Sequence, residues 1–484
     1  MQASGFLPRT NGKKLILAII DGLTPEMLER GLDQGRLPAL GLIHEAGTYT
    51  RGTTTFPSVT PVCLTSIATG AHPDVHEIPH LVWYHREEAR VVEYGSSFAA
   101  VRAAGTRRSL RDSVFAMTQE HLARDAVTVF EALEDEGLDT GAINFTCYRG
   151  RTRHELKLPV PTGRNRWYEA VWGPRRFFFF NLYESDPTGA PLAIRSRPEG
   201  SIDAYAATIG RWLVTRDGFD FLVFYLPDYD YASHIVGPED ALVALEWADS
   251  SVGELMAAAG GPEEFLDRYA IVVCSDHGQT RVDRVARLRD AYADLDVFTG
   301  RRGEDPSAAD IVVTASNRSG MVYALNGLGP RELAERLDGA PGVDVALFEE
   351  DGEAVARRER TELRFAPAYD GWRTTGDERV LDAALYPNAL ERAWCALACP
   401  NAGEVIVSAA AGWEFEDLGR RHHAGGGSHG SLLAGDSTVP ILTAGLEDRA
   451  LPDHPSTTDL APLALAHFGV ERPASMRARV KSGV

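Results

Sequence analysis

Continuous apolar runs recur along this chain and alternate with stretches of helical character. The runs cover residues 15–20, 140–145, 219–225 and 269–274. Such runs are typical of strands buried on both faces of a parallel sheet. Helices are expected over residues 25–34, 126–136 and 239–259. The alternation predicts an α/β fold with a mostly parallel sheet flanked by helices.

The pattern loosens between residues 290 and 403, where Gly, Arg and Glu are frequent. Strands are expected at 311–314 and 321–325 and a helix at 331–337, and a strand at 404–408 is expected to resume the core. We therefore predict a catalytic core of residues 1–290 and 404–484, with an inserted cap subdomain at 291–403.

Two further segments, about 86–122 and 149–200, are expected to form lid-like parts of the core. The first is polar and charged and predicts surface loops, whereas the second is rich in arginine and aromatic residues. Within it, residues 177–180 are four phenylalanines and predict one strand packed on both sides.

Polar side chains follow the predicted strands, at the point where each strand ends. Because the carboxyl ends of parallel strands lie along one edge of a sheet, these side chains can converge. A late glycine-rich loop adds a further histidine. Carboxylates and imidazoles together suit Zn²⁺, and carboxylates also bind Mn²⁺. The candidate metal ligands are Asp21, Asp230, His234, Asp276, His277 and His429.

Thr60 is predicted to cap the N-terminus of a helix, because Pro61 follows it and apolar residues recur at Val62, Leu64 and Ile67. A hydroxyl in this position faces unpaired N–H groups and the positive end of the helix dipole, where a phosphate is favoured. Taken alone, a capping threonine is commonly structural. Its interpretation as a nucleophile depends on the metal ligands.

Composition narrows the classes of partner. The chain has 484 residues, with 49 basic and 69 acidic side chains and a net charge of −20. This charge argues against binding a nucleic-acid polymer or an anionic membrane, although metal ions would admit a small anionic substrate. The five cysteines are sparse and odd in number, which favours a reducing compartment without disulfides. No signal peptide or membrane-length apolar run is evident, so we expect a cytoplasmic protein.

Several short motifs occur together and in a fixed order. They resemble those of the type I phosphodiesterase/nucleotide pyrophosphatase family of the alkaline phosphatase superfamily, over roughly 15–90 and 215–445. The matching pieces are Ile-Ile-Asp21-Gly, Phe-Pro-Ser-Val-Thr60 with Ala-Thr-Gly70, Pro-Asp-Val-His76, Asp230-Tyr-Ala-Ser-His234, Ser-Asp276-His277-Gly and Gly-Ser-His429-Gly.

The resemblance implies an alkaline-phosphatase-like core and a two-metal hydrolase of phosphate diesters or nucleotide pyrophosphates. Its cofactors would be two divalent ions, zinc by the family pattern and manganese as the alternative. Thr60 would bridge the metals and form a phosphothreonine intermediate. The substrate would be a small phosphorylated molecule, with a nucleotide as the family-based expectation. One metal would bind Asp230, His234 and His429, and the other Asp21, Asp276 and His277.

The chain departs from the family pattern at three points. Thr55 has a similar context to Thr60, but its distance to Gly70 is five residues too long. Pro61 removes a backbone N–H beside the nucleophile. Relatives place an asparagine shortly after the His-x-Ile segment, and residues 78–85 contain none. His80 or His85 would have to substitute for it.

The sequence leaves alternatives open. A phosphomonoesterase or a phosphonate hydrolase of the same superfamily fits the same metal ligands. A catalytically weak metal-binding protein is favoured by Pro61 and the missing asparagine. A sulfatase is disfavoured, because the Cys/Ser-x-Pro-x-Arg element is missing near Thr60. If the substrate is a nucleotide, Trp83 or Tyr84 is expected to stack on its base.

Overall fold

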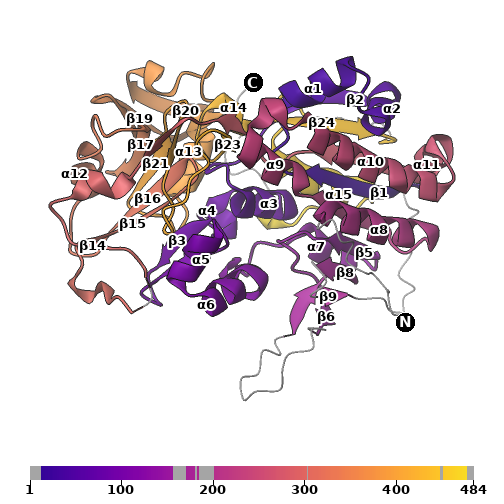
Figure 1. Cartoon of the computed structure of the whole chain (residues 1–484), viewed down its shortest axis with the longest axis horizontal. Helices are drawn as coiled ribbons and strands as arrows, with labels where there is room; N and C mark the ends of the chain where they lie inside the picture. Colours follow the sequence, from indigo (N-terminus) through magenta and orange to yellow (C-terminus); the bar gives the residue numbers. More distant parts are fainter. Residues whose placement is uncertain are drawn as a thin grey trace.

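A mixed eight-stranded sheet forms the centre of one half of the molecule (Figure 1). The computed structural model describes residues 12–155, 170–179, 183–184, 201–301, 303–446 and 451–476. Five neighbouring strands run parallel, and β24, β2 and β9 are antiparallel to their partners. The strand order is β2 (Thr48–Thr53), β24 (Thr438–Ala444), β11 (Tyr269–Cys274), β1 (Lys14–Ile20), β10 (Phe221–Leu226), β5 (Thr140–Ile143), β8 (Arg176–Phe179) and β9 (Tyr183–Glu184).

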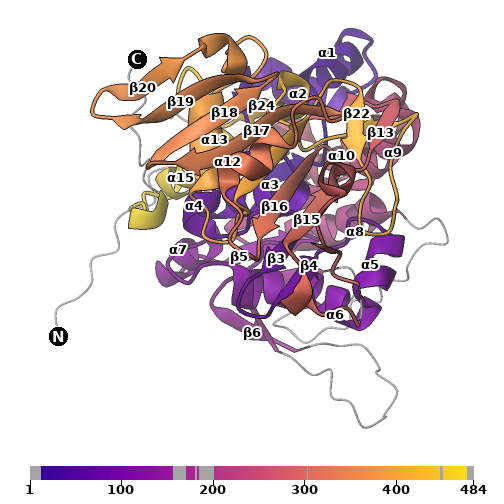
Figure 2. The ribbon, with the colours of Figure 1, turned by 90° about the vertical axis from the view of Figure 1, so that its left-hand side faces the viewer.

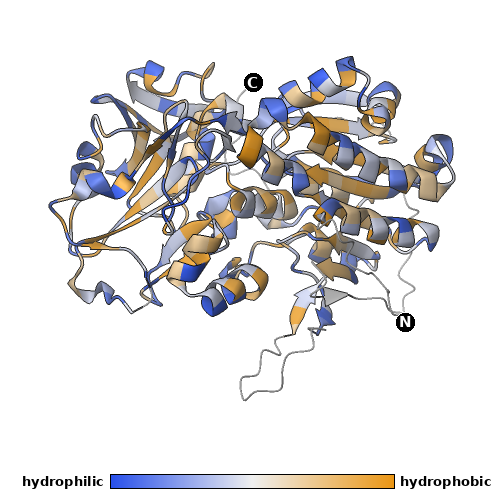
Figure 3. Cartoon of the chain, viewed as in Figure 1, coloured by the Kyte–Doolittle hydropathy of each residue, from blue (hydrophilic) through white to orange (hydrophobic). Residues whose placement is uncertain are grey.

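Helices cover both faces of this central sheet, which confirms the predicted architecture. The inner strands are largely apolar (Figure 3), because both of their faces are buried. One face packs against α3 (Thr60–Thr69), α7 (Val129–Asp135) and α15 (Leu460–His467). The other packs against α1 (Pro25–Asp33), α2 (Pro38–Ala46), α8 (Ile202–Thr215), α10 (Leu242–Ala259) and α11 (Pro262–Arg268).

A second eight-stranded sheet, mostly antiparallel, forms the other half (Figure 2). Helices α12 (Pro330–Glu335) and α13 (Ala389–Leu397) pack on its opposite faces. Its order is β14 (Val297–Phe298), β15 (Ile311–Ser316), β16 (Ser319–Ala324), β21 (Val405–Ala409), β17 (Val343–Glu350), β18 (Glu353–Arg358), β19 (Thr361–Ala368) and β20 (Gly371–Gly376).

The sequence analysis predicted β15, β16 and α12 but missed the hairpins β17–β20. Their exposed face carries ion pairs, such as Arg331 with Glu350 at 2.6 Å and with Glu362 at 2.7 Å. These charges obscure the alternation of apolar and polar positions. The strand predicted at residues 404–408 is confirmed as β21, which pairs with β16 and β17 in the second sheet. The division into core and cap subdomain stays a prediction.

The segment 86–122 is folded, so the expectation of surface loops is wrong. It contains β4 (Arg90–Glu93), paired with β3 (Val82–His85), then α5 (Phe98–Ala104), α6 (Thr106–Arg111) and a π-helix (Asp112–His121). Ser97 caps α5 by accepting from Ala100 N, and Arg90 pairs with the buried Asp112 at 2.6 Å. These local caps and ion pairs supply the order that composition alone did not indicate.

Much of the segment 149–200 lies outside the described residues. Phe177, Phe178 and Phe179 are buried on β8, as the four-phenylalanine motif predicted, and Phe180 lies outside the described part. Within the described ranges, no helix has the length and apolar character that a membrane span requires. The remaining elements are α4 (Pro73–His76), β6 (Thr152–His154), β7 (Val171–Gly173), α9 (Asp228–Val236), β12 (Thr280–Arg281), β13 (Arg284–Ala286), β22 (Trp413–Phe415), β23 (Gly427–Ser428) and α14 (Ala434–Ser437).

Strand β4 buries a carboxyl group, Glu93. Burial raises its pKa from 4.5 to about 7, although Gly95 and Ser96 donate hydrogen bonds to it. Folding therefore takes up a proton in this range, and stability falls as the pH rises from about 4.5 to about 7. We expect Glu93→Gln to remove this contribution, which is about 3 kcal/mol at most. Melting temperatures of both proteins from pH 5 to pH 8 should diverge in favour of the variant, and a constant offset would contradict this.

Candidate active site

Three neighbouring strands of the central sheet bring their carboxyl ends to one place, between the two sheets (Figure 1). Asp21 follows β1 directly, Asp230 lies on α9 just after β10, and Asp276 follows β11 by one residue. Gly22 has φ +69°, and a Cβ atom there would lie 2.8 Å from Asp230 Oδ1. Glycine is therefore required after Asp21, because a side chain at position 22 would collide with Asp230.

The first group of converging side chains is Asp21, Asp276 and His277, all buried. His277 Nε2 lies 3.3 Å from Asp21 Oδ1 and 3.5 Å from Asp276 Oδ2. Burial raises the pKa of Asp21 well above its usual range, and the carboxylates of Asp276 and Asp230 raise it further. The site concentrates carboxyl groups whose negative charge a bound cation would neutralise.

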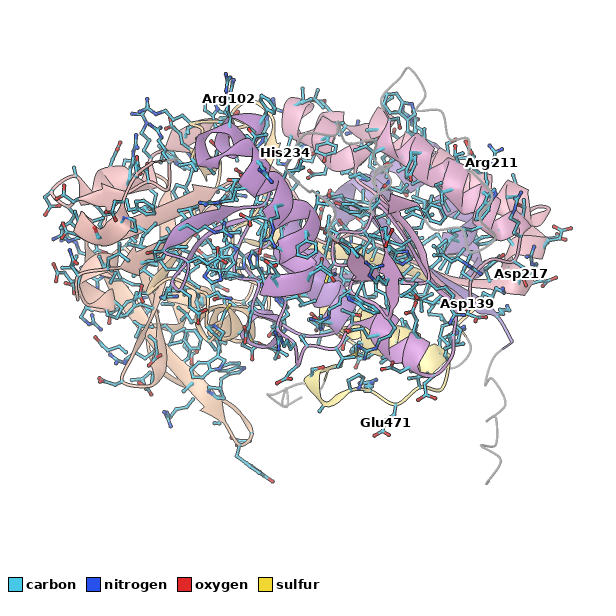
Figure 4. The ribbon with its side chains drawn as sticks, turned by 90° about the horizontal axis from the view of Figure 1, so that it is seen from below. Arg102, Asp139, Arg211, Asp217, His234 and Glu471 are labelled. Carbon is cyan, nitrogen blue, oxygen red and sulfur yellow. The ribbon has the colours of Figure 1, made fainter. Side chains whose placement is uncertain are left out.

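The second group is Asp230, His277 and His429, with His234 beside it. Asp230 Oδ2 lies 3.2 Å from His234 Nε2, and Asp230 Oδ1 lies 3.9 Å from His429 Nε2. Burial alone would raise the pKa of Asp230, but His234 and the other imidazoles hold it below its usual range. His234 lies on α9, two and a half turns of helix where a loop or one turn was expected. Figure 4 shows it between the two halves of the molecule.

The three histidines are oriented in the same way. Each donates its Nδ1–H to a backbone carbonyl: His234 to Gly427 at 2.8 Å, His277 to Gly278 at 3.0 Å, and His429 to Ser58 at 2.9 Å. Their Nε2 atoms therefore face inward, as in protein metal sites. Burial alone would lower the pKa of His234, but the Asp230 carboxylate raises it above its usual range. Burial lowers the pKa of His429 well below its usual range, which keeps its lone pair free of a proton at neutral pH.

The donor set fits divalent metal ions. Asp21 Oδ1 and Asp276 Oδ2 are buried without a hydrogen-bond partner among the described residues. Acceptor oxygens without a donor are costly in a protein interior. Here they lie beside inward-facing imidazole lone pairs, so acceptor atoms meet acceptor atoms. Carboxylate and imidazole ligands arranged in this way suit zinc or a similar ion.

Thr60 is brought to the same place as these ligands. The prediction that Thr60 is the N-cap is wrong by one position, because the N-cap is Val59 and Thr60 is the first residue of α3. Its Oγ1 lies 3.1 Å from His277 Nε2. Thr55, the rival nucleophile, is fully buried and bonded to His72 Nδ1 at 2.9 Å. Thr60 thus lies beside a candidate metal ligand, whereas the Thr55 hydroxyl is engaged by His72; the assignment of Thr60 as nucleophile stays a prediction.

Two residues of the site were missed in the sequence analysis. Asn317, in the turn between β15 and β16, donates from Nδ2 to His429 Nε2 at 2.9 Å. Ser316 fixes the amide by donating to Asn317 Oδ1 at 3.2 Å. Gln279 donates to Asp230 Oδ1 at 2.7 Å. An asparagine between two strands indicates only a turn, so its role could not be predicted from sequence.

The residues expected near the substrate from segment 78–85 are otherwise engaged. His80 Nε2 lies 2.8 Å from the Ser319 hydroxyl. Trp83 is 0% exposed and Tyr84 is 4% exposed, so the expectation that either stacks on a base is wrong. His85 stacks on Trp83, and with Glu88 and His121 it forms a third group of candidate ligands outside the strand-end site.

Solved structures of similar fold support this arrangement of sheets and helices. Phosphonoacetate hydrolase from Sinorhizobium meliloti 1021 is 18% identical with a TM-score of 0.57, and the match covers 95% of this chain and 96% of that one. Murine ectonucleotide pyrophosphatase/phosphodiesterase 5 is 14% identical with a TM-score of 0.56 and the same coverage. The human protein of that name is 13% identical with a TM-score of 0.55, covering 97% of both chains. These likenesses confirm the predicted alkaline-phosphatase-like fold.

Sequence comparison gives the family directly. No curated protein matches the chain. A family model matches residues 15–432, which includes the strand-end ligands, Thr60 and Asn317. The chain belongs to the type I phosphodiesterase/nucleotide pyrophosphatase family.

Proposed function

We propose that this chain is a two-metal hydrolase of phosphate diesters or nucleotide pyrophosphates, with Thr60 as its nucleophile. Family membership indicates a hydrolase of phosphorylated substrates. The proposal of two metal ions and a Thr60 nucleophile rests on one observation. Inward-facing imidazoles and unpaired carboxylate oxygens converge beside the Thr60 hydroxyl. The proposed ligands are Asp230, His234 and His429 for one ion, and Asp21, Asp276 and His277 for the other.

The two ions, zinc with manganese as the alternative, would lower the pKa of the Thr60 hydroxyl and neutralise charge on the phosphoryl group. Thr60 attacks phosphorus and forms a bond through Oγ1, while the bond to the leaving oxygen breaks. Its place at the N-terminus of α3 adds favourable dipole charge for the phosphoryl oxygens. A second displacement by water then frees the phosphorylated product from Thr60.

Asn317 supplies the donor that Pro61 and segment 78–85 do not. Ser316 orients the Asn317 amide by donating a hydrogen bond to its Oδ1. The amide in turn donates from Nδ2 to the lone pair of His429 Nε2. When that lone pair is engaged by a ligand, the Nδ2–H groups become free to donate to a phosphoryl oxygen. Such a donor strengthens binding most where charge develops in the transition state.

The ligands bound in the structures of the neighbours indicate the class of compound to test. The phosphonoacetate hydrolase was solved with phosphonoformate, and a threonine-to-alanine variant of the murine protein, described as inactive, was solved with AMP. A small phosphorylated substrate is therefore proposed for this chain. Phosphonate hydrolysis is the second candidate, because the buried Trp83 and Tyr84 provide no aromatic surface for a base.

A panel of p-nitrophenyl esters tests the proposal. We expect a methyl phosphodiester to be hydrolysed faster than the monoester, with activity lost on chelation and restored by zinc or manganese. Faster hydrolysis of the monoester would indicate a phosphomonoesterase. Release of phosphate from a phosphonate, without diester hydrolysis, would indicate the second candidate. Two bound metals without turnover of any of these compounds would indicate a binding protein.

Asn317→Ala is expected to lower kcat for the diester about 100-fold, the size of effect seen when one transition-state donor is removed. Metal content should stay the same, because Asn317 carries no proposed metal ligand atom. Asn326→Ala, in an exposed loop after β16, serves as the control. Loss of metal without a specific loss in kcat would show that Asn317 only supports His429.

A further inference from the structure

A small cavity lies beside the proposed active site. Its walls are the β3–β4 hairpin, strand β15, the segment 287–301 and the loop 416–420 (Figure 2). Its volume is about 60 Å³. A water needs at least about 10–15 Å³, so the cavity has room for a small anionic group such as a phosphate or a carboxylate.

The cavity is lined by four arginines, Arg287, Arg289, Arg301 and Arg420. Arg287 pairs with Glu416 at 2.8 Å. Among the described residues, no carboxylate lies within ion-pair distance of the other three guanidinium groups. In the described part of the chain most arginines form an ion pair, and three without one gather around this cavity, which favours a site for an anion.

Two buried polar atoms of the same cavity also have no partner among the described residues. They are the hydroxyl of Thr314, which is 3% exposed, and Oδ2 of Asp417, which is 8% exposed. Buried groups of this kind are normally hydrogen-bonded. A bound anion would satisfy the Thr314 hydroxyl by accepting from it, but not Asp417 Oδ2, which is itself an acceptor. Counting Glu416 and Asp417 against the four arginines, the lining keeps a net charge of +2.

The cavity adjoins the metal-ligand cluster along two of its walls. Thr314 lies on β15 and precedes Asn317, in the turn that follows, by three residues, which is about 10 Å of extended chain. On the other wall, Arg420 precedes His423 by three residues, and the His423 ring stacks on His234 with centroids 4.0 Å apart. A single substrate of modest size can reach both places.

We infer that this cavity binds a second anionic group, a phosphate or a carboxylate, on the part of the substrate that leaves. The inference rests on the proposed function and names its substrate class: a diester or pyrophosphate whose leaving group ends in an anion. The guanidinium groups of Arg289, Arg301 and Arg420 bind this anion, and the Thr314 hydroxyl donates to it.

Binding is tested first, without turnover. Inorganic phosphate is titrated by calorimetry into the chelator-treated protein, whose carboxylate-rich centre repels anions. We expect phosphate to bind, and binding to weaken about tenfold or more in the triple variant Arg289→Met, Arg301→Met, Arg420→Met. Arg360→Met, an exposed arginine at the turn between β18 and β19, should bind like the parent. Absence of binding to the parent, or equal binding to the triple variant, would overturn the inference. Succinate, titrated separately, distinguishes a carboxylate-bearing leaving group from a phosphate-bearing one.

Turnover gives the second test. Methyl phosphodiesters are compared whose leaving phenols carry a short arm ending in a carboxylate, a phosphate or a neutral amide. An anionic arm should raise kcat/KM about tenfold over the neutral arm by lowering KM. The ratio of kcat/KM between the anionic and the neutral esters should fall toward one in the triple variant but not in Arg360→Met. Equal turnover of all three esters by the parent would overturn the inference and leave the proposed function intact. If no ester is hydrolysed, the proposed function fails and the calorimetry alone decides what the cavity binds.

Discussion

Replacing Asp230 or His429 by alanine is expected to reduce the bound metal from two toward one equivalent per chain and to abolish measurable turnover. Asp230 is the carboxylate on which the second group depends, because it contacts His234 at 3.2 Å, His429 at 3.9 Å and Gln279 at 2.7 Å. The loss of one ion removes several kcal/mol of transition-state stabilisation, which is a factor of about a thousand or more in rate.

Metal content by elemental analysis and kcat for the diester measure this effect. Asp240→Ala and His422→Ala are matched controls, because both residues are exposed and lie close in sequence to the ligands they are compared with. Both controls should keep two ions and full activity. Two tightly held ions in Asp230→Ala and in His429→Ala would refute the assignment of these ligands.

Thr60→Ala is expected to keep the fold and much of the metal but to lose at least about a thousandfold in kcat, because a water is less well positioned than the Thr60 hydroxyl. Thr60→Ser should retain part of the activity, since it removes only a methyl group. The serine hydroxyl would occupy the same position in the first turn of α3. In the parent, the Thr60 hydroxyl lies 3.1 Å from His277 Nε2.

Thr55→Ala is the control for the two Thr60 variants. It distinguishes a loss of folding stability from a loss of catalytic activity. Thr55 is fully buried and bonded to His72, so its loss should lower the free energy of unfolding by about 1–3 kcal/mol. Its activity per folded molecule should remain near that of the parent. An inactive Thr55→Ala together with an active Thr60→Ala would move the nucleophile five residues earlier in the chain.

The core of the fold was predictable from sequence because its signals are local. Strands β1, β10 and β11 are almost entirely apolar, and the polar residues that follow them lie at one sheet edge. Asp21, Asp230 and Asp276 could therefore be placed together without knowing any contact. The resemblance to the family supplied their pairing with His234, His277 and His429.

The second sheet and the remaining site residues depend on contacts distant in sequence. Strand β21 lies between β16 and β17, a position that its apolar run alone does not indicate. Asn317 reaches His429 only because the β15–β16 turn is held there by the bond from Arg318 N to His429 O at 2.8 Å. The buried state of Trp83 likewise follows from packing against His85, Tyr94 and His121. None of these contacts could be predicted from the residues adjacent in sequence.

The most direct test of the account is to trap the intermediate. The metal-loaded protein is quenched at low pH during turnover of a slow diester, digested, and its peptides are analysed by mass spectrometry. The account predicts a phosphoryl group on Thr60, within the peptide that spans the start of α3, and its absence from the Thr60→Ala protein. A phosphoryl group on Thr55, or an unmodified peptide during confirmed turnover, would contradict it.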